Sequence, residues 1–295
     1  MRKVRLLIAS CLFAVPALAG PADIPQFQYF YAVPGADLAW SVASAPEGTI
    51  RTAGVGTQSV FGYTREGSPL GGWPTGVPTM NLAVADDGTV WVTSDGGGDV
   101  RSYISSGSPL VTIPAEGGAL ATGPGGDVFV ATPSTVFRFR PDGTPAGSRP
   151  FCISNGCLYV HLRGIAVGPD TTVYVAFDDS GLHFMSWFRP AGGSGALPWP
   201  WPARSPRGVA LDPASGELFV SFHADAAGPD GVVKYPAAGD TVGTAFVPSA
   251  MVLGGITADG GGHLHVPTSL GVARFGLGTD PVRRTSWGAI KRLGH

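Results

Sequence analysis

Hydrophobic and polar positions alternate along this chain in short segments, and one arrangement of these segments recurs six times. Each copy begins with an aliphatic–small–aliphatic triplet, passes through a polar turn that ends in glycine, and then alternates apolar and polar residues. Alternation of this kind predicts a β-strand, and a fixed spacing between copies predicts a repeat architecture. The small residue of the triplet marks each copy: Ala43, Ala83, Ala121, Ala166, Ala210 and Thr257.

The spacing between copies indicates which repeat this is. Successive small residues lie 38 to 47 positions apart, which is the length of one four-stranded propeller blade. In four copies the second strand carries a large ring on the face opposite its aliphatic residues, which predicts packing between adjacent blades. The first and sixth copies have Arg51 and His265 at this position, so we expect their junction to differ chemically. The four rings are Trp91, Phe129, Tyr174 and Phe219.

The remaining strands of each copy predict how the ring closes. A third strand recurs as a valine with an aromatic residue three positions later, although the fourth copy is degenerate over 183–188. Fourth strands are short and marked by proline, as edge strands often are. The sixth copy has no evident fourth strand after Phe275, and the apolar stretch 27–32 is the candidate to supply it. We therefore predict an all-β, six-bladed β-propeller of four-stranded antiparallel blades, closed by an N-terminal strand.

The start of the chain predicts export. A basic head, about ten apolar residues and an Ala17-Leu-Ala19 end describe a secretory signal peptide over 1–19. A lipoprotein cleavage box at Cys11 is a poorer fit, because it leaves almost no apolar region before the cut. The propeller then occupies 20–279 and a basic tail 280–295. No later segment reaches the ~20 apolar residues of a spanning helix, so we expect a periplasmic or secreted monomer without a membrane span.

The net charge indicates which partners are not expected, and the cysteine content predicts the oxidation state of the mature chain. Cleavage removes Arg2, Lys3 and Arg5 and no acid, which changes the net charge from −2 to −5. Nucleic acid is therefore not an expected partner, because phosphate backbones require a broad basic surface. The mature chain keeps Cys152 and Cys157, which predict a disulfide in an oxidising compartment. The alternative, a two-thiol metal site, lacks further cysteine ligands.

Two of the copies carry a family resemblance. The segments 207–220 (RGVALDPASGELFV) and 81–92 (NLAVADDGTVWV) resemble NHL repeats and the related repeats of streptogramin-lyase-type propellers, over about residues 26–279. The resemblance implies a blade architecture that hosts lyases, lactone-opening enzymes and binding platforms, so it does not imply one activity. The chain also departs from the enzymes: Trp91-Val-Thr-Ser94 ends without the acid of the lyase-type pattern, and the early glutamate of the lactonase type is missing.

One hypothesis places a divalent metal on the face where the loops between second and third strands gather. Carboxylates suit Ca²⁺ or Mg²⁺, whereas added imidazoles favour Zn²⁺ or Mn²⁺. Such an ion would polarise a carbonyl in a lyase or lactonase while a histidine carries the proton. Acidic residues are also common in turns that bind no metal, and this interpretation of the aspartates is favoured over a metal site. The candidate ligands are Asp178, Asp179, His183, His223 and Asp225.

The second hypothesis is a binding platform on the same face, which we call the top face. Tryptophans in proline-stiffened loops suit protein, peptide or glycan surfaces, and two arginines before the glycines that open first strands favour an anionic ligand at the channel mouth. We expect the binding or scaffold role, with a metal-dependent lyase or lactonase as the alternative. No catalytic residue is assigned. The candidate ligand-binding residues are Trp73, Arg163, Trp199, Trp201 and Arg207.

Overall fold

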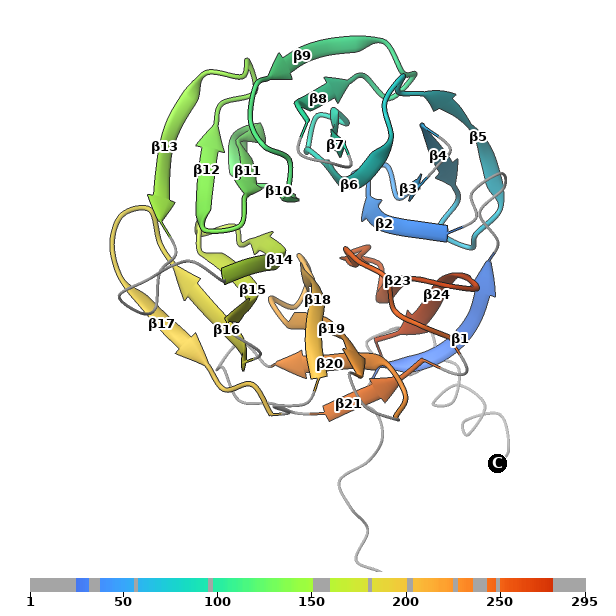
Figure 1. Cartoon of the computed structure of the whole chain (residues 1–295). Coiled ribbons are helices and arrows are strands. Elements are labelled where there is room, and N and C mark those ends of the chain that lie inside the picture. The colour runs from blue at the N-terminus through green and yellow to red at the C-terminus, as the bar shows by residue number, and fades with distance from the viewer. Residues whose placement is uncertain are drawn as a thin grey trace, which may run out of the picture.

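The computed structural model is a ring of β-sheets around a central channel (Figure 1). Strands β2, β6, β10, β14 and β18 border the channel, and the last strand of each sheet lies at the rim. The described strands form six four-stranded antiparallel sheets, which confirms the predicted propeller. The structure describes residues 25–31, 38–55, 58–94, 98–150, 160–179, 182–200, 204–224, 228–235, 243–247 and 250–277.

The first three blades follow the sequence copies in order. Blade 1 consists of β2 (Leu38–Ser44), β3 (Ile50–Val55), β4 (Ser59–Tyr63) and β5 (Pro69–Pro74). Blade 2 consists of β6 (Thr79–Val84), β7 (Val90–Ser94), β8 (Val100–Tyr103) and β9 (Pro109–Ile113). Blade 3 consists of β10 (Ala119–Thr122), β11 (Val128–Ala131), β12 (Thr135–Phe139) and β13 (Pro145–Pro150), with a single 3₁₀ turn at Pro124–Gly126 between its first two strands.

Blades 4 and 5 have the longest inner strands. Blade 4 consists of β14 (Val160–Val167), β15 (Val173–Asp179), β16 (Leu182–Phe188) and β17 (Ser194–Leu197). Blade 5 consists of β18 (Arg204–Leu211), β19 (Leu218–Ala224), β20 (Gly231–Tyr235) and β21 (Gly243–Phe246). The third strand of blade 4, degenerate in sequence, is nevertheless a full strand that pairs with β15 along its whole length. It forms because Met185 is buried between blades 4 and 5 and Phe188 is buried between blades 3 and 4.

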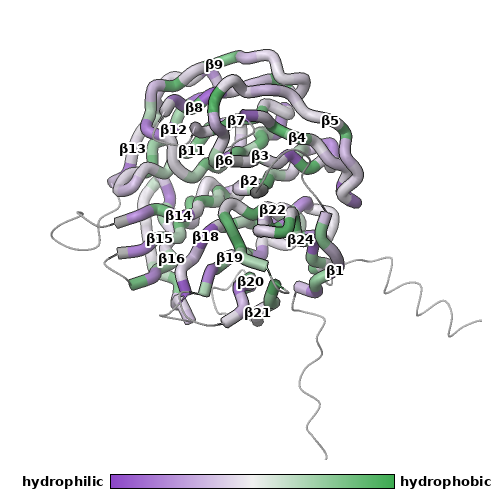
Figure 2. The backbone as a smooth tube through the Cα atoms, turned by 45° about the vertical axis from the view of Figure 1, so that its right-hand side comes forward, coloured by the Kyte–Doolittle hydropathy of each residue, from purple (hydrophilic) through white to green (hydrophobic). Residues whose placement is uncertain are grey.

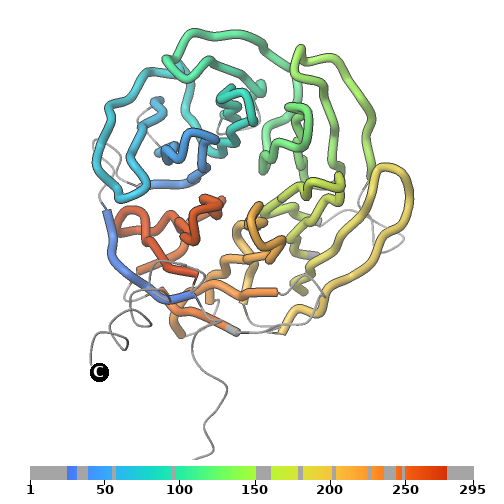
Figure 3. The backbone as a smooth tube through the Cα atoms, turned by 180° about the vertical axis from the view of Figure 1, so that it is seen from behind, coloured from blue at the N-terminus to red at the C-terminus, as the bar shows by residue number. Residues whose placement is uncertain are grey.

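The N-terminal segment completes blade 6, as the sequence predicts. Blade 6 joins β22 (Thr257–Ala258), β23 (His263–Thr268) and β24 (Gly271–Gly276) to β1 (Gln26–Tyr31), in the order β1-β24-β23-β22. Figure 3 shows β1, in blue, along the outer edge of the red strands. Phe27 and Phe30 of β1 pack against the cluster that blades 5 and 6 share. The first and last parts of the fold are therefore held in one sheet.

Apolar packing between the sheets holds the ring together. Figure 2 shows apolar residues recurring along the strands of every blade. Trp91 of blade 2 packs with Leu120 of blade 3, and Phe129 of blade 3 packs with Val173 of blade 4. Phe219 of blade 5 likewise packs in the cluster that blade 6 shares. The rings predicted to fill the inter-blade spaces at these three positions therefore do so.

Candidate functional site

A β-bulge in the inner strand places an arginine at the top of blade 4. The pairing register of β14 with β15 shifts between Leu162 and Gly164, which leaves Arg163 as the extra residue. The same shift between Pro206 and Gly208 makes Arg207 the extra residue of β18. Bulges re-aim side chains and occur often beside functional sites. The inner strands of blades 1 and 2 have the same shift, at Trp40 and Met80, so the bulge belongs to the repeat and the arginine at this position distinguishes blades 4 and 5.

Asp178, at the end of β15, gathers three neighbours from two blades. Its Oδ2 accepts a hydrogen bond from Nε of Arg163 at 2.7 Å, and its Oδ1 lies 2.8 Å from Nδ1 of His183. The hydroxyl of Ser205, from blade 5, reaches the two carboxylate oxygens at 3.4 and 3.2 Å. A carboxylate can only accept, so a neutral His183 must carry its proton on Nδ1. We call these four residues the Asp178 cluster.

The Asp178 cluster is compact but not sealed. The Asp178 side chain is 11% exposed and the His183 side chain 7%. The Arg163 side chain, in contrast, keeps 38% of its surface exposed. Among the described residues, Asp178 is the only acid that pairs with Arg163, and it engages Nε. The terminal guanidinium nitrogens, which lie beyond Nε, are thus the part of the cluster that a ligand can reach.

Blade 5 carries a second carboxylate–histidine pair at the corresponding place. Nδ1 of His223 lies 2.9 Å from Oδ2 of Asp230, whose carboxylate also accepts from the backbone N–H groups of Ala224 at 2.9 Å and Val252 at 2.6 Å. Asp230 is buried, and the His223 side chain is 26% exposed. Because Asp230 holds the Nδ1 proton, the lone pair of a neutral His223 resides on Nε2, the arrangement expected of a general base.

Ser205 connects the two pairs. It lies directly opposite His223 in the register of β18 with β19, while its hydroxyl bonds Asp178 of the neighbouring blade. Sequence reasoning did not single out Ser205, because a serine two positions before the bulge is indistinguishable from any strand serine. The role of Asp230 as the partner of His223 was also not foreseen.

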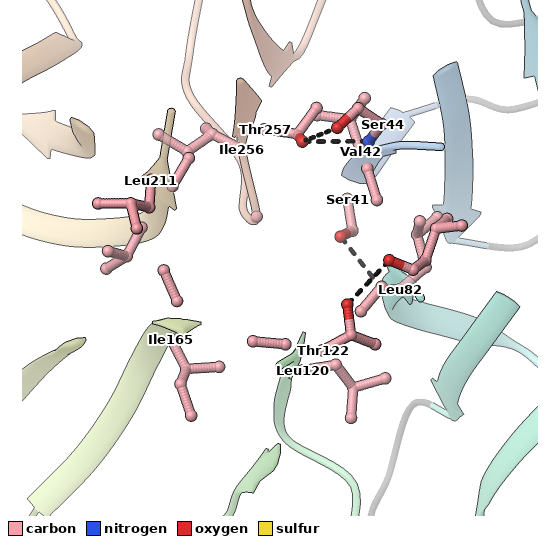
Figure 4. A pocket seen from close by; sticks show the side chains of 18 of the residues that line it. Ser41, Val42, Ser44, Leu82, Leu120, Thr122, Ile165, Leu211, Ile256 and Thr257 are labelled. Atoms are coloured by element: carbon pink, nitrogen blue, oxygen red, sulfur yellow. Dashed lines mark hydrogen bonds between the residues drawn. The ribbon is translucent and has the colours of Figure 1, made fainter. Parts of the chain in front are cut away.

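The channel that Arg163 borders is a lined cavity of about 370 Å³. Small and aliphatic side chains of the inner strands surround it (Figure 4). The alanines that mark the repeat are among its lining residues. Hydroxyl groups join neighbouring blades around it: Ser44 meets Thr257 at 3.0 Å, and Thr122 donates to the carbonyl of Val84 at 2.8 Å. The small residues of the repeat therefore leave the central channel open, and its wall carries only a few hydroxyl groups among apolar side chains. Of the two bulge arginines, Arg163 lines this cavity and Arg207 is not among its lining residues.

A third charged group, which we call the Asp259 cluster, lies at the turn of blade 6. Oδ2 of Asp259 is 2.9 Å from Nε of Arg65, 3.1 Å from Nδ1 of His263 and 3.6 Å from Nε2 of His265. Burial alone would raise the pKa of Asp259, but hydrogen bonding to the histidines and to backbone N–H groups holds that pKa far below its ordinary value. Burial lowers the pKa of His265, which fills the ring position between blades 6 and 1 as predicted.

The predicted tryptophans take structural positions where the structure describes them. Trp73 lies in β5, packs between blades 1 and 2, and its ring centroid is 4.8 Å from that of Tyr103. Trp199 donates from Nε1 to the carbonyl of Arg204 at 2.9 Å and packs against the cluster between blades 4 and 5. We therefore leave both rings out of the candidate site. Trp201, Cys152 and Cys157 lie outside the described residues, and their assignments stay predictions.

The hypothesised metal ligands are only partly brought together. His183 pairs with Asp178 across β15 and β16, whereas His223 pairs with Asp230 in the next blade. In the part of the chain that the structure describes, no group of three or more His, Cys, Asp or Glu is arranged to hold an ion. An ion at Asp178 would compete with the Arg163 guanidinium for the same oxygens. Asp225 and the side chain of Asp179 lie outside the description, so the five-residue set stays a prediction.

Comparison with solved structures identifies the architecture. A streptogramin B lyase is 13% identical with a TM-score of 0.61, over 85% of this chain and 97% of that chain. A gluconolactonase of Xanthomonas campestris is 15% identical with a TM-score of 0.63, over 85% and 94%. This chain has the fold of these six-bladed propellers. Virginiamycin B lyase from Staphylococcus aureus is also similar, at 14% identity and a TM-score of 0.57 over 85% and 89%.

These likenesses concern the fold. No protein-family model matches the sequence, and no curated protein sequence matches it. Within the described residues, no helix has the length and hydropathy needed to cross a membrane. One architecture hosts many chemistries, so the function must be argued from the residues of this chain.

Proposed function

We propose that the protein is an exported binding propeller that takes a carboxylate-bearing ligand, such as the C-terminus of a peptide, at the mouth of its channel over blades 4 and 5. The observation that carries this proposal is the Arg163–Asp178 pair. Asp178 fixes the guanidinium through Nε at 2.7 Å, and the side chain keeps more than a third of its surface exposed at the channel.

The chemistry of arginine explains why an anion is the expected ligand. A guanidinium presents its donors in a planar fork that matches a carboxylate with two parallel hydrogen bonds. Asp178 restricts the motion of this fork before any ligand arrives, which lowers the entropy lost on binding. His183 and Ser205 also contact the Asp178 carboxylate, so Asp178 keeps its position when a ligand binds to Arg163.

The test compares two peptides that differ only in charge. Calorimetric titration would use N-acetyl-Ala-Phe with a free carboxylate and the same peptide as its C-terminal amide. We expect the acid to bind at least ten-fold more tightly, and Arg163→Gln to remove this preference, because a charge-assisted bidentate pair is replaced by a neutral contact. Arg101→Gln, on the third strand of blade 2 and 35% exposed, is the matched control. Equal binding of acid and amide, or an unchanged preference in Arg163→Gln, would contradict the proposal.

The His223–Asp230 pair supports a second candidate function, a lyase or lactone hydrolase. The structures of similar fold include a streptogramin B lyase and a gluconolactonase, and His223 is oriented to accept a proton on Nε2. A divalent ion bound by Asp178, Asp179, His183, His223 and Asp225 would supply carbonyl polarisation in such an enzyme.

The assay for this candidate is hydrolysis of glucono-δ-lactone followed by acid release at constant pH. Turnover above the uncatalysed rate that falls at least 100-fold in His223→Gln would support the enzyme, since general-base catalysis contributes ~10²–10⁴-fold. Metal analysis of the same preparation distinguishes a metal-dependent reaction from one that uses His223 as the general base without an ion. Turnover that is unchanged in His223→Gln would exclude this pair as the proton acceptor.

A further inference from the structure

A second cavity lies at the rim of the ring, between blades 3 and 4. It has a volume of about 360 Å³, within the range of small-molecule sites. Its floor consists of Phe129, Val136 and Phe188, all buried residues of the cluster that the two blades share. The outer strand β13, at the rim beside blade 4 (Figure 1), supplies one wall, and Pro190 of blade 4 supplies part of the other. We call it the rim groove.

The rim groove stays open because neither Gly147 nor the residue opposite it, Arg138, fills the space above the glycine. Gly147 of β13 lies opposite Arg138 in the strand register, with φ +138°, and a methyl group placed on it would meet no atom within 4 Å. In blade 4 the corresponding glycine, Gly195, lies opposite Trp187, whose indole nitrogen would be 2.7 Å from such a methyl group. The space that Trp187 fills in blade 4 is thus left open in blade 3.

One of the two arginines that line the groove gives it a net positive charge. Asp127 engages Arg138 at Nε, at 2.6 Å, and also at a terminal guanidinium nitrogen, unlike Asp178, which engages Arg163 at Nε. Arg149 stacks over the ring of Phe188, 4.8 Å from its centroid, and no acid among the described residues pairs with it. An apolar floor beside one uncompensated, planar cation is complementary to a flat organic anion, which can stack on the guanidinium while its charge meets the N–H groups.

The flanking prolines argue against a protein strand as the occupant. β13 begins at Pro145 and ends at Pro150, and proline cannot donate to a new strand at its edge. The C-terminal tail of this chain is also a poor match, because Arg283, Arg284, Lys291 and Arg292 would meet a groove of the same charge.

We propose that the rim groove is a binding site for amphipathic aromatic carboxylates, separate from the channel mouth. The ring would lie between Gly147 and the apolar floor, and the carboxylate would pair with Arg149. This site faces outward between two blades, so occupation there leaves the top face open.

Calorimetric titration with 2-naphthoate tests the proposal. Naphthalene-2-methanol and 2-naphthylmethylammonium have the same ring with a neutral and a positive group. We expect the carboxylate to bind at least ten-fold more tightly than either. Arg149→Gln should weaken naphthoate binding at least ten-fold, and Arg149→Lys should restore part of the loss because it keeps the charge.

Two further variants locate the ligand. Ala146→Phe adds a ring to a residue that lines the groove and should abolish binding. Arg140→Gln, an exposed arginine of the same blade outside the groove, should leave it unchanged. The three substituted positions lie near the surface, and thermal unfolding of each variant shows whether it is folded. Binding of the alcohol or the amine as tight as that of naphthoate would overturn the proposal, as would unchanged affinity in Arg149→Gln or Ala146→Phe.

Discussion

The hydroxyl of Tyr31 lies 3.3 Å from Nδ1 of His265, a residue 234 positions later in the chain. Tyr31 belongs to the closing strand β1, and His265 fills the position between blades 6 and 1 where other blades carry a ring. Nε2 of the same histidine faces Asp259 at 3.6 Å. One buried imidazole thus lies between the closing strand and the Asp259 side chain, and we expect protonation of His265 to change the contacts that close the ring.

The first prediction concerns stability against pH. Burial lowers the pKa of His265 below its ordinary value of 6.5, so below about pH 6.5 the unfolded chain takes up a proton that the folded protein resists. Stability must therefore fall as pH decreases from 6.5 toward the folded-state pKa, by up to about 1.4 kcal/mol per pH unit for one proton. The depressed pKa of Asp259 adds a further loss below about pH 4.

Urea unfolding at pH 8, 6 and 5 measures this dependence. His265→Phe should be less stable than the natural protein at pH 8, because it loses the contacts to Tyr31 and Asp259, but its stability should change less between pH 6.5 and 5. His161→Gln, at an exposed position of β14, is the control and should keep the natural slope. A His265→Phe variant with the full slope would show that another group causes the dependence.

The second prediction concerns the centre of the Asp178 cluster. Asp178→Ala leaves Arg163, His183 and Ser205 without their common acceptor, and we expect it to lower the free energy of unfolding by about 2–3 kcal/mol. Arg163→Gln should lower it by only about 0.5–1 kcal/mol, since that side chain is more than a third exposed and its charge is screened by water. Denaturant unfolding of both variants and of the double variant would give the coupling between the two residues. A larger effect for Arg163→Gln than for Asp178→Ala would contradict the arrangement described.

The third prediction concerns the close approach of inner strands. A methyl group on Gly254 would lie 2.2 Å from the carbonyl oxygen of Trp40, whereas one on Gly255 would meet the hydroxyl of Ser41, a side chain that can rotate. Gly254→Ala should therefore destabilise the protein by about 1–3 kcal/mol or more, through forced backbone movement, and Gly255→Ala by less. Thermal unfolding of the Gly254→Ala and Gly255→Ala variants compares the cost of a clash with backbone to the cost of a clash with a side chain. Equal losses would show that the backbone clash of Gly254 with Trp40 costs no more than displacing the Ser41 hydroxyl.

The fourth prediction concerns Cys152 and Cys157, which lie outside the described residues. If the mature protein is exported as proposed, we expect a thiol titration under denaturing, non-reducing conditions to find no free thiol. After reduction the same titration should find two. Two free thiols before reduction would exclude the bridge.

The architecture was predictable from the sequence because its cause is local and repeated. Each blade carries the same alternation, turn glycine and small inner residue, and packing between equivalent sheets then permits few other arrangements. The assignment of β1 to blade 6 followed from a missing fourth strand after Phe275 and was confirmed by pairing with β24. Even the unusual junction of blades 6 and 1 was visible in His265.

The candidate site was predictable only in part because its contacts cross blades. The pairing of Asp178 with His183 follows from their opposition in one sheet, but its contact with Ser205 depends on the relative rotation of two sheets, which no spacing within a repeat specifies. Trp73 lies in β5 because that strand extends to Pro74, further than the sequence pattern indicated. The rim groove escaped prediction for a different reason: blades 3 and 4 both have a glycine at this place, and only the contact of Trp187 with Gly195 fills the space in blade 4.

The use of β1 to complete blade 6 has a consequence for biosynthesis. β1 is made before the other described strands of the propeller, yet its partner β24 is made after all of them. Until then the chain carries an unpaired strand at each end, and such edges promote aggregation. The ring can therefore close only after the last blade has been made, and folding of this propeller must wait for the end of the domain.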